Sequence, residues 1–391
     1  MRILAIETSC DESSFAILDV HENNHDITYR VLAHTIHSQI DVHQEFGGVF
    51  PALAKREHQK NLIPLFIKTL KDADMLVLRE KTILEKEKEM IEAQLSHEKE
   101  LAALYIPFLE QYELPSFDAI TVTTGPGLEP ALWVGINFAK VLAKLTNTAL
   151  IPVNHMEGHI ASVITKGQSE FTLPKIAFPA LALLISGGHT ELVLMHGWGQ
   201  YEILGKTLDD AVGEAFDKVA RLLHLSYPGG PEVSKKAAIA RDENIEKTVV
   251  LPRPMMYTKN YDFSFSGLKT AVLYSVKDKE LSEAQICDLC REFEESVTDV
   301  LIHKTKNALQ EHGIETLIIG GGVSANSFIQ NAFKKLCDEN GVELYLPSKD
   351  VTGDNALMIG IVGALSYVDN NALKKALIPL DEIKACGSLS F

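Results

Sequence analysis

The chain has 391 residues, of which 46% are hydrophobic, and its formal net charge is −16. A single hydrophobic core stops growing at about 250–300 residues, so this length predicts two lobes. The first residues, MRILAIETSC, are too polar for a signal peptide, and no later apolar run reaches the ~20 residues that a membrane-spanning helix needs. We therefore expect a soluble, cytoplasmic protein with no membrane partner.

The cysteine count and the net charge further limit the class of protein and the ligands that it can bind unaided. Five cysteines are an odd number in a long chain, which argues against a disulfide framework and fits a reducing compartment. A net charge of −16 argues against unaided nucleic-acid binding, because affinity for phosphates rests largely on Lys and Arg. An RNA substrate would need local basic patches or a partner protein. Small clusters such as Lys55-Arg56 and Lys334-Lys335 exist, but such pairs are also common on ordinary solvated surfaces.

Two pairs of apolar runs share one plan. Residues 2–7 and 15–20 flank the polar stretch TSCDESS, and residues 181–186 and 191–195 flank the turn GGHT. Each pair predicts a β-hairpin, and their repetition indicates two related lobes.

The remaining pattern alternates strands with helices. Strands are expected at 119–123, 149–153 and 316–320, and helices at 51–72, 130–145, 209–223, 231–241, 266–277, 282–312, 325–339 and 354–368. This alternation predicts an α/β architecture.

Residues 76–112 differ from their surroundings, because they are charged and rich in good helix formers. A heptad-like stripe predicts a protruding helix or helical hairpin, and its members are Leu84, Met90, Ile91, Leu95, Leu101 and Ala102. Seven Glu against five Lys or Arg between Arg79 and Glu100 argue against a direct grip on RNA. Two interpretations stay open, a solvated insertion and a docking surface for a partner or a second subunit.

The segment NHMEGH carries the strongest chemical signal. Asn154 follows a strand and is placed to cap a helix, so His155 and His159 would lie at i and i+4 on one face. Such a pair can share a metal ion, although two unrelated histidines are the alternative. A metalloprotease would need its base immediately after the first histidine. Glu157 is instead about 200° around the helix from His155, which argues against that class.

Four loops carry glycines that can bring backbone amides close to phosphate oxygens. They are Gly125-Pro126-Gly127, Ser186-Gly187-Gly188-His189-Thr190, Pro228-Gly229-Gly230-Pro231 and Gly320-Gly321-Gly322-Val323-Ser324-Ala325-Asn326. One such loop is usually a simple turn, but several in one α/β chain favour a nucleotide or phosphate ligand.

Asp354 has two possible roles at the start of the last predicted helix. It could cap that helix, or it could complete a 2-His-1-carboxylate set with the two histidines. Such a set suits Fe(II) or Zn(II) and leaves positions for substrate oxygens. The pair Cys287 and Cys290 lies in a helical pattern with no second pair, so we interpret it as structural.

A set of motifs runs in order along nearly the whole chain: ETSCDESS at 7–14, GGVFPALAKREH at 47–58, GPG at 125–127, NHMEGH at 154–159, LISGGHTEL at 184–192, DDAVGEAFDKVAR at 209–221, YPGGP at 227–231, FSFSGLKTAV at 263–272, GGGVSAN at 320–326 and TGDNALMIG at 352–360. This ordered set resembles the bacterial TsaD family of tRNA threonylcarbamoyltransferases. Three features depart from the usual family pattern: the insertion at 76–112, Glu129-Pro130, and Glu191 in place of a common glutamine.

The resemblance implies a two-lobed fold of the actin, sugar kinase and Hsp70 (ASKHA) type. We expect duplicated mixed-sheet lobes formed by residues 1–153 with 354–391 and by residues 154–353, with the helical insertion in the first. It also implies an acyltransferase that moves a threonylcarbamoyl group from threonylcarbamoyl-AMP to the N6 amine of the adenosine 3′ of the anticodon, in tRNAs reading codons that start with A. A non-catalytic nucleotide-binding scaffold is the alternative, and a metallopeptidase is a less favoured one.

The resemblance further assigns residues. It implies that His155, His159 and Asp354 bind one divalent metal per subunit, Fe(2+) before Zn(2+). The adenylate would be held by Leu184, Ile185, Ser186, Gly187, Gly188, Asp217, Gly230 and Asn326. We expect Asp11 and Glu12 to supply a base near the attacking amine, with a structural role in the hairpin loop as the alternative. The implied partners are tRNA, adenine nucleotides, a TsaB-type subunit and a TsaE-type ATPase.

Overall fold

The computed structural model describes residues 1–23, 26–44, 48–164, 169–347, 353–368 and 378–391. They form two compact units. The N-terminal unit is Met1–Pro174 with Asp354–Phe391, and the C-terminal unit is Lys175–Gly353. Both are mixed α/β structures, as predicted.

The sheet of the N-terminal unit has six strands in the order β5-β4-β1-β2-β3-β6. The strands are β1 (Arg2–Glu7), β2 (Glu12–Asn23), β3 (Asp26–Ser38), β4 (Ala119–Gly125), β5 (Ala149–Asn154) and β6 (Glu170–Thr172). The predicted hairpin is confirmed, because β1 pairs with β2 antiparallel while β4 and β5 continue the sheet in parallel.

The sheet of the C-terminal unit repeats this plan in the order β11-β10-β7-β8-β9. The strands are β7 (Ala180–Ile185), β8 (Thr190–Gly197), β9 (Gln200–Lys206), β10 (Thr316–Gly320) and β11 (Glu343–Tyr345). An antiparallel meander is again followed by two parallel strands on the other side of the first strand. The duplication that the two hairpins predicted is therefore confirmed at the level of whole sheets.

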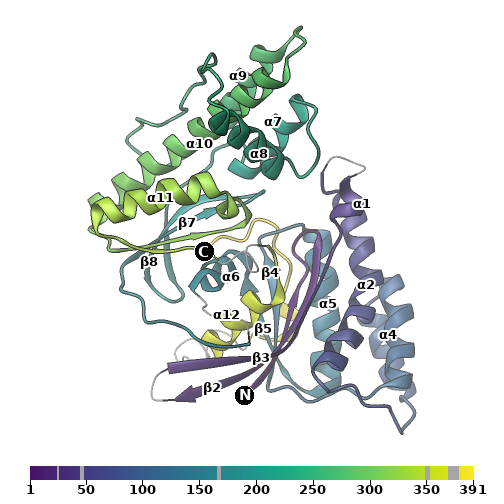
Figure 1. The fold of residues 1–391 in the computed structure, drawn as a ribbon. Helices are drawn as coiled ribbons and strands as arrows, with labels where there is room; N and C mark the ends of the chain where they lie inside the picture. Colours follow the sequence, from purple (N-terminus) through teal and green to yellow (C-terminus); the bar gives the residue numbers. More distant parts are fainter. Residues whose placement is uncertain (24–25, 45–47, 165–168, 348–352, 369–377) are drawn as a thin grey trace. The chain divides into compact units, whose positions relative to one another are not determined.

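Helices cover both faces of the N-terminal sheet (Figure 1). They are α2 (Pro51–Asp72), α5 (Glu129–Thr146), α6 (His155–Ile164) and α12 (Ala356–Val368), while the short helix α1 (Ile40–Gln44) follows β3 in the chain. One face packs on α2 and α5, and its core contains the ring contacts of Phe15 with Phe66 and Phe138. The other face carries α12, which packs against β1, β2 and α6.

The insertion forms a helical hairpin, as predicted, but it does not protrude. Its helices are α3 (Glu85–Gln94) and α4 (Lys99–Gln111), and α4 packs on α2. Ile91, Leu101 and Tyr105 are fully buried in the core of the N-terminal unit. The expectation that the hairpin protrudes is wrong because these apolar side chains face α2 and α5, although most of its charged side chains are exposed.

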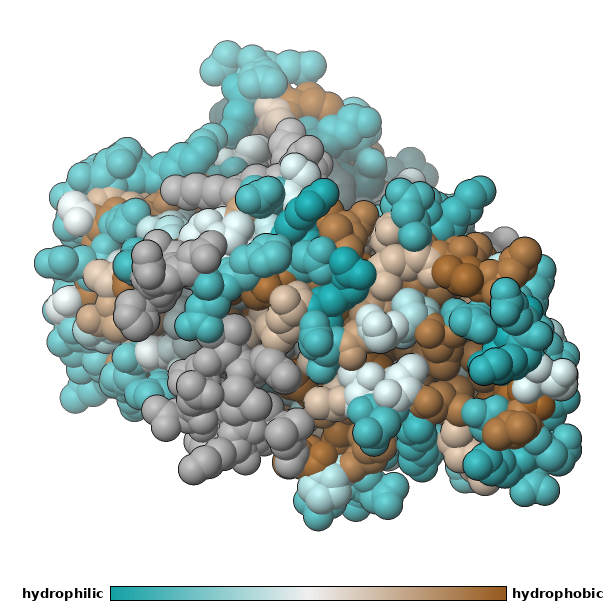
Figure 2. Space-filling model, turned by 90° about the horizontal axis from the view of Figure 1, so that it is seen from below, coloured by the Kyte–Doolittle hydropathy of each residue, from teal (hydrophilic) through white to brown (hydrophobic). Residues whose placement is uncertain are grey.

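The insertion still leaves some apolar surface. Val77, Leu78 and Leu84 are each more than half exposed, at 55%, 67% and 53%. Figure 2 shows one face of the molecule, on which apolar side chains lie between hydrophilic ones.

The C-terminal unit has its own core between its sheet and its helices. The helices are α7 (Val212–Leu222), α8 (Gly229–Asp242), α9 (Ser266–Val276), α10 (Glu283–His312) and α11 (Ser327–Asn340), with a short 3-10 turn η1 (Gly322–Ala325). A second 3-10 turn, η3 (Leu380–Glu382), lies in the C-terminal segment of the chain, which belongs to the N-terminal unit. Cys287 and Cys290 are buried on α10, and burial raises the pKa of both thiols, which is consistent with a structural role.

The division between the units falls after Pro174, later in the chain than the expected lobe boundary at residue 153. Helix α6 belongs to the N-terminal unit because it packs on α12. All three predicted metal ligands therefore lie in one unit. Among the described residues, every helix is too short or too polar to span a lipid bilayer.

Candidate active site

Helix α6 begins where the sequence predicted it. Asn154 ends β5, and its Oδ1 accepts hydrogen bonds from the backbone N–H groups of Met156 and Glu157, at 2.9 and 3.4 Å. This cap starts the helix at His155 and places His159 one turn further on the same face. Both imidazoles are buried, and their ring centroids are 4.7 Å apart.

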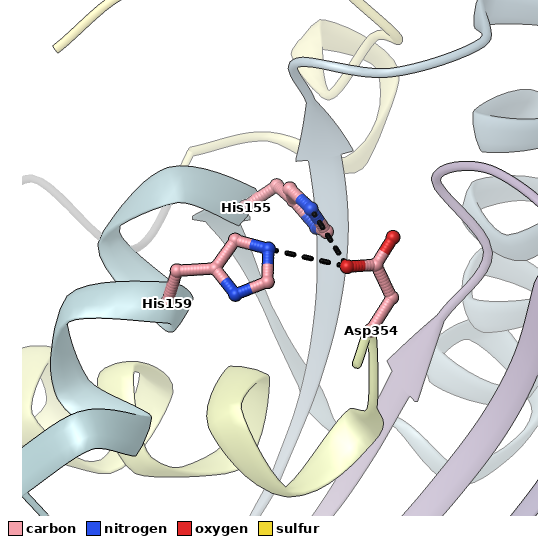
Figure 3. Close-up of side chains that lie close together, drawn as sticks. All are labelled: His155, His159 and Asp354. Atoms are coloured by element: carbon pink, nitrogen blue, oxygen red, sulfur yellow. Dashed lines mark ion pairs between the residues drawn. The ribbon is translucent and has the colours of Figure 1, made fainter. Parts of the chain in front are cut away.

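Asp354 is not the cap of the last helix. Helix α12 starts at Ala356, and Asn355 supplies the cap, because its Oδ1 accepts from the backbone N–H of Met358 at 3.1 Å. The Ser14 hydroxyl oxygen also accepts from the N–H of Ala356, which fixes the helix start against β2. The Asp354 carboxylate therefore points to the histidines instead of the helix (Figure 3).

The three side chains converge on one point. Asp354 Oδ1 lies 3.4 Å from His155 Nε2 and 3.1 Å from His159 Nε2 (Figure 3). One ligand atom from each residue lies within 4.8 Å of the others. Two ligands ~2.1 Å from a metal are about 3.0 Å apart at an octahedral angle and about 3.4 Å apart at a tetrahedral one. The arrangement therefore has the dimensions of a metal site.

The charges around this point also suit a cation. Burial disfavours a charged His155, but Asp354 and Glu7 outweigh it and raise the pKa of the imidazole well above its usual value. Burial likewise works against ionised Asp354, yet the two histidines hold the pKa of its carboxyl well below the usual range. Carboxylates thus stabilise positive charge at this position, which a divalent ion would supply directly.

The structure brings Asp11 and Glu12 to the same region. Burial raises the pKa of Glu12 to about 10, and the carboxylates of Asp354, Asp11 and Glu7 add to the shift. Burial and the same acidic neighbours Asp11 and Asp354 raise the pKa of the Cys10 thiol, which keeps it protonated.

A buried network fixes the loop that carries these residues. His58 contacts the Cys10 carbonyl through Nε2 at 3.0 Å and the Ser13 hydroxyl through Nδ1 at 2.7 Å. The Asp11 carbonyl accepts from the backbone N–H of Gln39. The loop is therefore tied to α2 and to the segment after β3.

The predicted adenylate residues lie in the C-terminal unit. Ser186 Oγ accepts from the N–H groups of Gly188 and His189, which shapes the turn after β7. A side chain added at Gly187 or Gly188 would meet nothing within 4 Å, so the turn has open space above it. Leu184 and Ile185 are fully buried in β7, so they could contact a ligand only through their backbone.

Asp217 and Gly230 are held together. The Asp217 carboxylate accepts from the N–H of Gly229 at 2.7 Å and also from that of Gly230. Burial raises the pKa of Asp217, although these two hydrogen bonds oppose the shift. A Cβ atom added at Gly230 would meet nothing within 4 Å, as at Gly187.

Asn326 is already fully hydrogen-bonded. Its Oδ1 caps α11 by accepting from Phe328 and Ile329, and its Nδ2 donates to Ser234 Oγ and Glu294 Oε1. A ligand contact through this amide would have to replace one of these bonds. The role of Asn326 in adenylate binding stays a prediction.

Comparison with known proteins decides the family. A profile of the TsaD family, described as tRNA N6-adenosine threonylcarbamoyltransferase, matches residues 30–79 and 90–361. The chain belongs to the TsaD family. Its members are transferases, and their description names an N6-adenosine of tRNA as the acceptor.

Individual relatives agree with this membership. A tRNA N6-adenosine threonylcarbamoyltransferase from Persephonella marina is 39% identical, covering 93% of this chain and 89% of the relative. The enzyme of the same name from Chromobacterium violaceum is also 39% identical and covers 93% of both chains.

A solved structure supports the fold. Full-length HypF, in its phosphate- and nucleotide-bound form, matches with a TM-score of 0.52 at 12% identity. The match covers 95% of this chain and 47% of HypF. The two-lobed ASKHA architecture expected from the motifs is thus confirmed.

The sequence interpretation gave no role to Glu7, which contacts His155. Glu7 is fully buried at the end of β1, and its Oε2 lies 3.2 Å from His155 Nδ1. An acidic residue closing an otherwise apolar strand was the available signal.

Proposed function

We propose that this TsaD-family transferase binds one divalent metal ion per subunit at His155, His159 and Asp354, with Fe(II) as the first candidate and Zn(II) as the second. The observation that carries the proposal is the convergence of two Nε2 atoms on one Asp354 oxygen, at 3.4 and 3.1 Å. Two imidazoles with one carboxylate suit either ion and leave coordination positions free for substrate oxygens. When bound, the ion supplies charge neutralisation at the mixed anhydride of the donor.

The reaction is transfer of threonylcarbamoyl from threonylcarbamoyl-AMP to the N6 amine of the adenosine 3′ of the anticodon, in tRNAs that read A-starting codons. The carbon–oxygen bond to AMP breaks, the carbon–nitrogen bond to adenine forms, and the amine loses a proton. No covalent enzyme intermediate is needed, because the adenine amine attacks the donor carbonyl directly.

The adenylate is bound, in this proposal, by the C-terminal unit. A Cβ atom added at Gly187, Gly188 or Gly230 would meet nothing within 4 Å, so a phosphate group can approach the backbone closely at these three positions. Asp217 accepts a ribose hydroxyl, and Leu184, Ile185 and Asn326 complete the frame around the turn.

Asp11 and Glu12 are proposed to receive the proton from the amine. A general base must be ionised. Glu12 instead keeps its proton near neutral pH, because it is buried and lies near the negative charges of Asp354, Asp11 and Glu7. Positive charge in the site is therefore a condition for Glu12 to act as a base. The rigid loop held by His58 keeps both carboxylates in place.

The negative net charge of the chain disfavours binding of tRNA, which is also negatively charged. At −16 the chain needs help to hold tRNA, so TsaB-type and TsaE-type proteins are proposed to complete the tRNA-binding assembly in the cytoplasm. The packed insertion lies on α2, so partners that approach this helix meet a wider surface than α2 alone.

The test is transfer of labelled threonylcarbamoyl from a preformed adenylate to unmodified tRNA, with the partner proteins supplied. His155→Ala should lose more than about 100-fold in rate, since it removes a ligand from the site. His196→Ala is the matched control, because His196 is exposed and pairs only weakly with Glu202 at 3.4 Å. Equal rates for wild type and His155→Ala, with folding verified, would refute the metal site.

Metal identity needs a separate arm. Metal-stripped protein is reloaded with Fe(II) under anaerobic conditions or with Zn(II), and both samples are assayed. Higher activity with Zn(II) would reverse our order of the two ions.

A further inference from the structure

Glu7 occupies an unusual place for a carboxylate. It ends β1, which is a central strand of the N-terminal sheet, and its side chain is fully buried. Burying an ionised carboxylate is costly unless hydrogen bonds and an opposite charge compensate it. The groups around Glu7 therefore indicate its role.

Three donors surround the carboxylate. Oε1 accepts from the backbone N–H of Ser9 at 2.5 Å, and Oε2 accepts from the Thr123 hydroxyl. Oε2 also lies 3.2 Å from Nδ1 of His155. Thr123 stands beside Glu7 because β1 and β4 pair in parallel, with Ile6 opposite Val122. The sheet itself thus fixes the orientation of Glu7.

The geometry separates Glu7 from the ligand set. Glu7 contacts Nδ1 of His155, whereas Asp354 contacts Nε2 of the same ring. These two nitrogens point in different directions from the ring, so the Glu7 carboxylate lies behind His155 as seen from Asp354. The Glu7 carboxylate can accept a hydrogen bond from Nδ1–H, while the lone pair of Nε2 stays available for a metal ion.

We infer that Glu7 is a positioning residue that holds His155 in the tautomer and ring orientation needed for metal binding. This inference rests on the metal site proposed above. A histidine ligand whose second nitrogen donates to a carboxylate has a fixed rotamer and is a stronger base, and loss of such a partner typically lowers metal affinity about 10- to 100-fold. Ser9 and Thr123 in turn hold Glu7 through its other two hydrogen bonds.

The experiment compares metal affinity in three variants of the full chain. Glu7→Gln keeps the size of the side chain but removes its charge, and Thr123→Val removes one of its donors. Glu98→Gln is the matched control, because Glu98 is also a buried carboxylate, bonded to Asn137 at 3.0 Å, but it lies in the insertion. The Zn(II) dissociation constant is measured by competition with a chelator, and the melting temperature of each variant is recorded.

Glu7→Gln should raise the Zn(II) dissociation constant about 10- to 100-fold, and Thr123→Val by a smaller factor in the same direction. Glu98→Gln should change the melting temperature but leave Zn(II) affinity within about twofold. Unchanged affinity in Glu7→Gln would overturn the inference while leaving the metal site intact. His159→Ala is measured in the same way. If its Zn(II) affinity equalled that of the wild type, both the metal site and the role of Glu7 would be refuted.

A spectroscopic readout covers the case in which Glu7→Gln does not fold. In wild-type protein loaded with Zn(II), long-range ¹H–¹⁵N spectra should show His155 with a proton on Nδ1 and the metal on Nε2. The Nδ1 proton should be shifted downfield and protected from exchange by its bond to Glu7. Coordination through Nδ1, or a rapidly exchanging Nδ1 proton, would overturn the inference.

Discussion

At the scale of single residues, His58 shows how burial fixes a loop near the site. Its ring is fully buried and bridges the Ser13 hydroxyl and the Cys10 carbonyl. Burial lowers the pKa of His58 to about 4, even though the Cys10 carbonyl favours the charged form. The native loop therefore requires a neutral imidazole.

This requirement makes stability depend on pH. In the unfolded chain His58 binds a proton below pH ~6.5, whereas in the native state it does so only below about 4. The unfolded state thus holds more protons between these values, so the free energy of unfolding falls as the pH drops from about 6.5 to 4. His58 contributes up to about 3 kcal/mol to this loss, and His34, whose pKa burial also lowers to about 4, adds to it.

Urea denaturation at several pH values measures the effect. His58→Gln should be less stable than wild type at pH 8, since Gln cannot bridge both partners as imidazole does, but its loss of stability toward pH 4 should be shallower. His21→Gln, at an exposed strand residue, serves as the control. Parallel pH curves for His58→Gln and wild type would contradict the prediction.

At the scale of elements, the C-terminal segment holds the loop that precedes α5. Cys386 donates its N–H to the Thr124 carbonyl, and the Gly387 carbonyl accepts from the N–H of Gly127. Lys140 of α5, itself buried, donates to the Ile383 carbonyl at 2.7 Å. The last residues of the chain thereby fix the turn between β4 and α5.

Gly125 allows this close approach. Its φ is +147°, and a Cβ atom would lie 2.0 Å from the Cys386 carbonyl oxygen. Gly125→Ala should therefore destabilise the protein by more than about 2 kcal/mol. Gly199→Ala is the control, because its φ is +70° but nothing lies within 4 Å of the added atom, so it should cost only about 1 kcal/mol. Chemical denaturation compares the two, and equal losses would show that the C-terminal segment does not press on the turn.

The insertion gives a second prediction at this scale. Tyr105 on α4 is fully buried against Phe108 and Phe138, whereas Leu104 beside it is 37% exposed. Tyr105→Ala should cost about 3–5 kcal/mol because it opens a cavity in the core, and Leu104→Ala should stay within about 1 kcal/mol. Thermal melting distinguishes the two variants. A small effect of Tyr105→Ala would mean that the insertion is not part of the core.

At the scale of the whole molecule, local pattern predicted some elements and long-range packing decided others. The motif-bearing strands and helices were found because their apolar periodicity and caps are local, as for α2 at Pro51–Asp72 and the Asn154 cap. Strand β3 was missed because its histidines and threonines break the alternation, and β9 and β11 because they are short or half exposed. These segments become strands because they pair with neighbouring strands of the sheet, and such long-range pairing cannot be predicted from local sequence pattern.

The site shows the same limit. The i, i+4 spacing predicted that His155 and His159 share a helix face, but the approach of Asp354 from a distant part of the chain could come only from the resemblance to a family. Capping statistics favoured Asp354 as a helix cap, yet Asn355 took that role. The role of Glu7 was not predicted because its partner, His155, lies 148 residues away in the sequence.

The division into two units predicts that metal and nucleotide binding are separable. Every proposed metal ligand lies in the N-terminal unit, and every proposed adenylate residue lies in the C-terminal unit. Gly230→Val should fold normally, because nothing lies within 4 Å of the added Cβ, but its side chain would fill the space assigned to the adenylate. We expect at least about tenfold weaker AMP binding with unchanged Zn(II) affinity.

His159→Ala should show the converse, with lost Zn(II) binding and AMP affinity within about threefold of wild type. Titration calorimetry of both variants with AMP and with Zn(II) measures all four values, and Gly267→Val, another open glycine position in the C-terminal unit, controls for the added bulk. If His159→Ala also lost AMP binding, the ion would contribute to nucleotide affinity as well as to charge neutralisation at the mixed anhydride of the donor. The result therefore tells whether transfer depends on two independent binding events or on one coupled site.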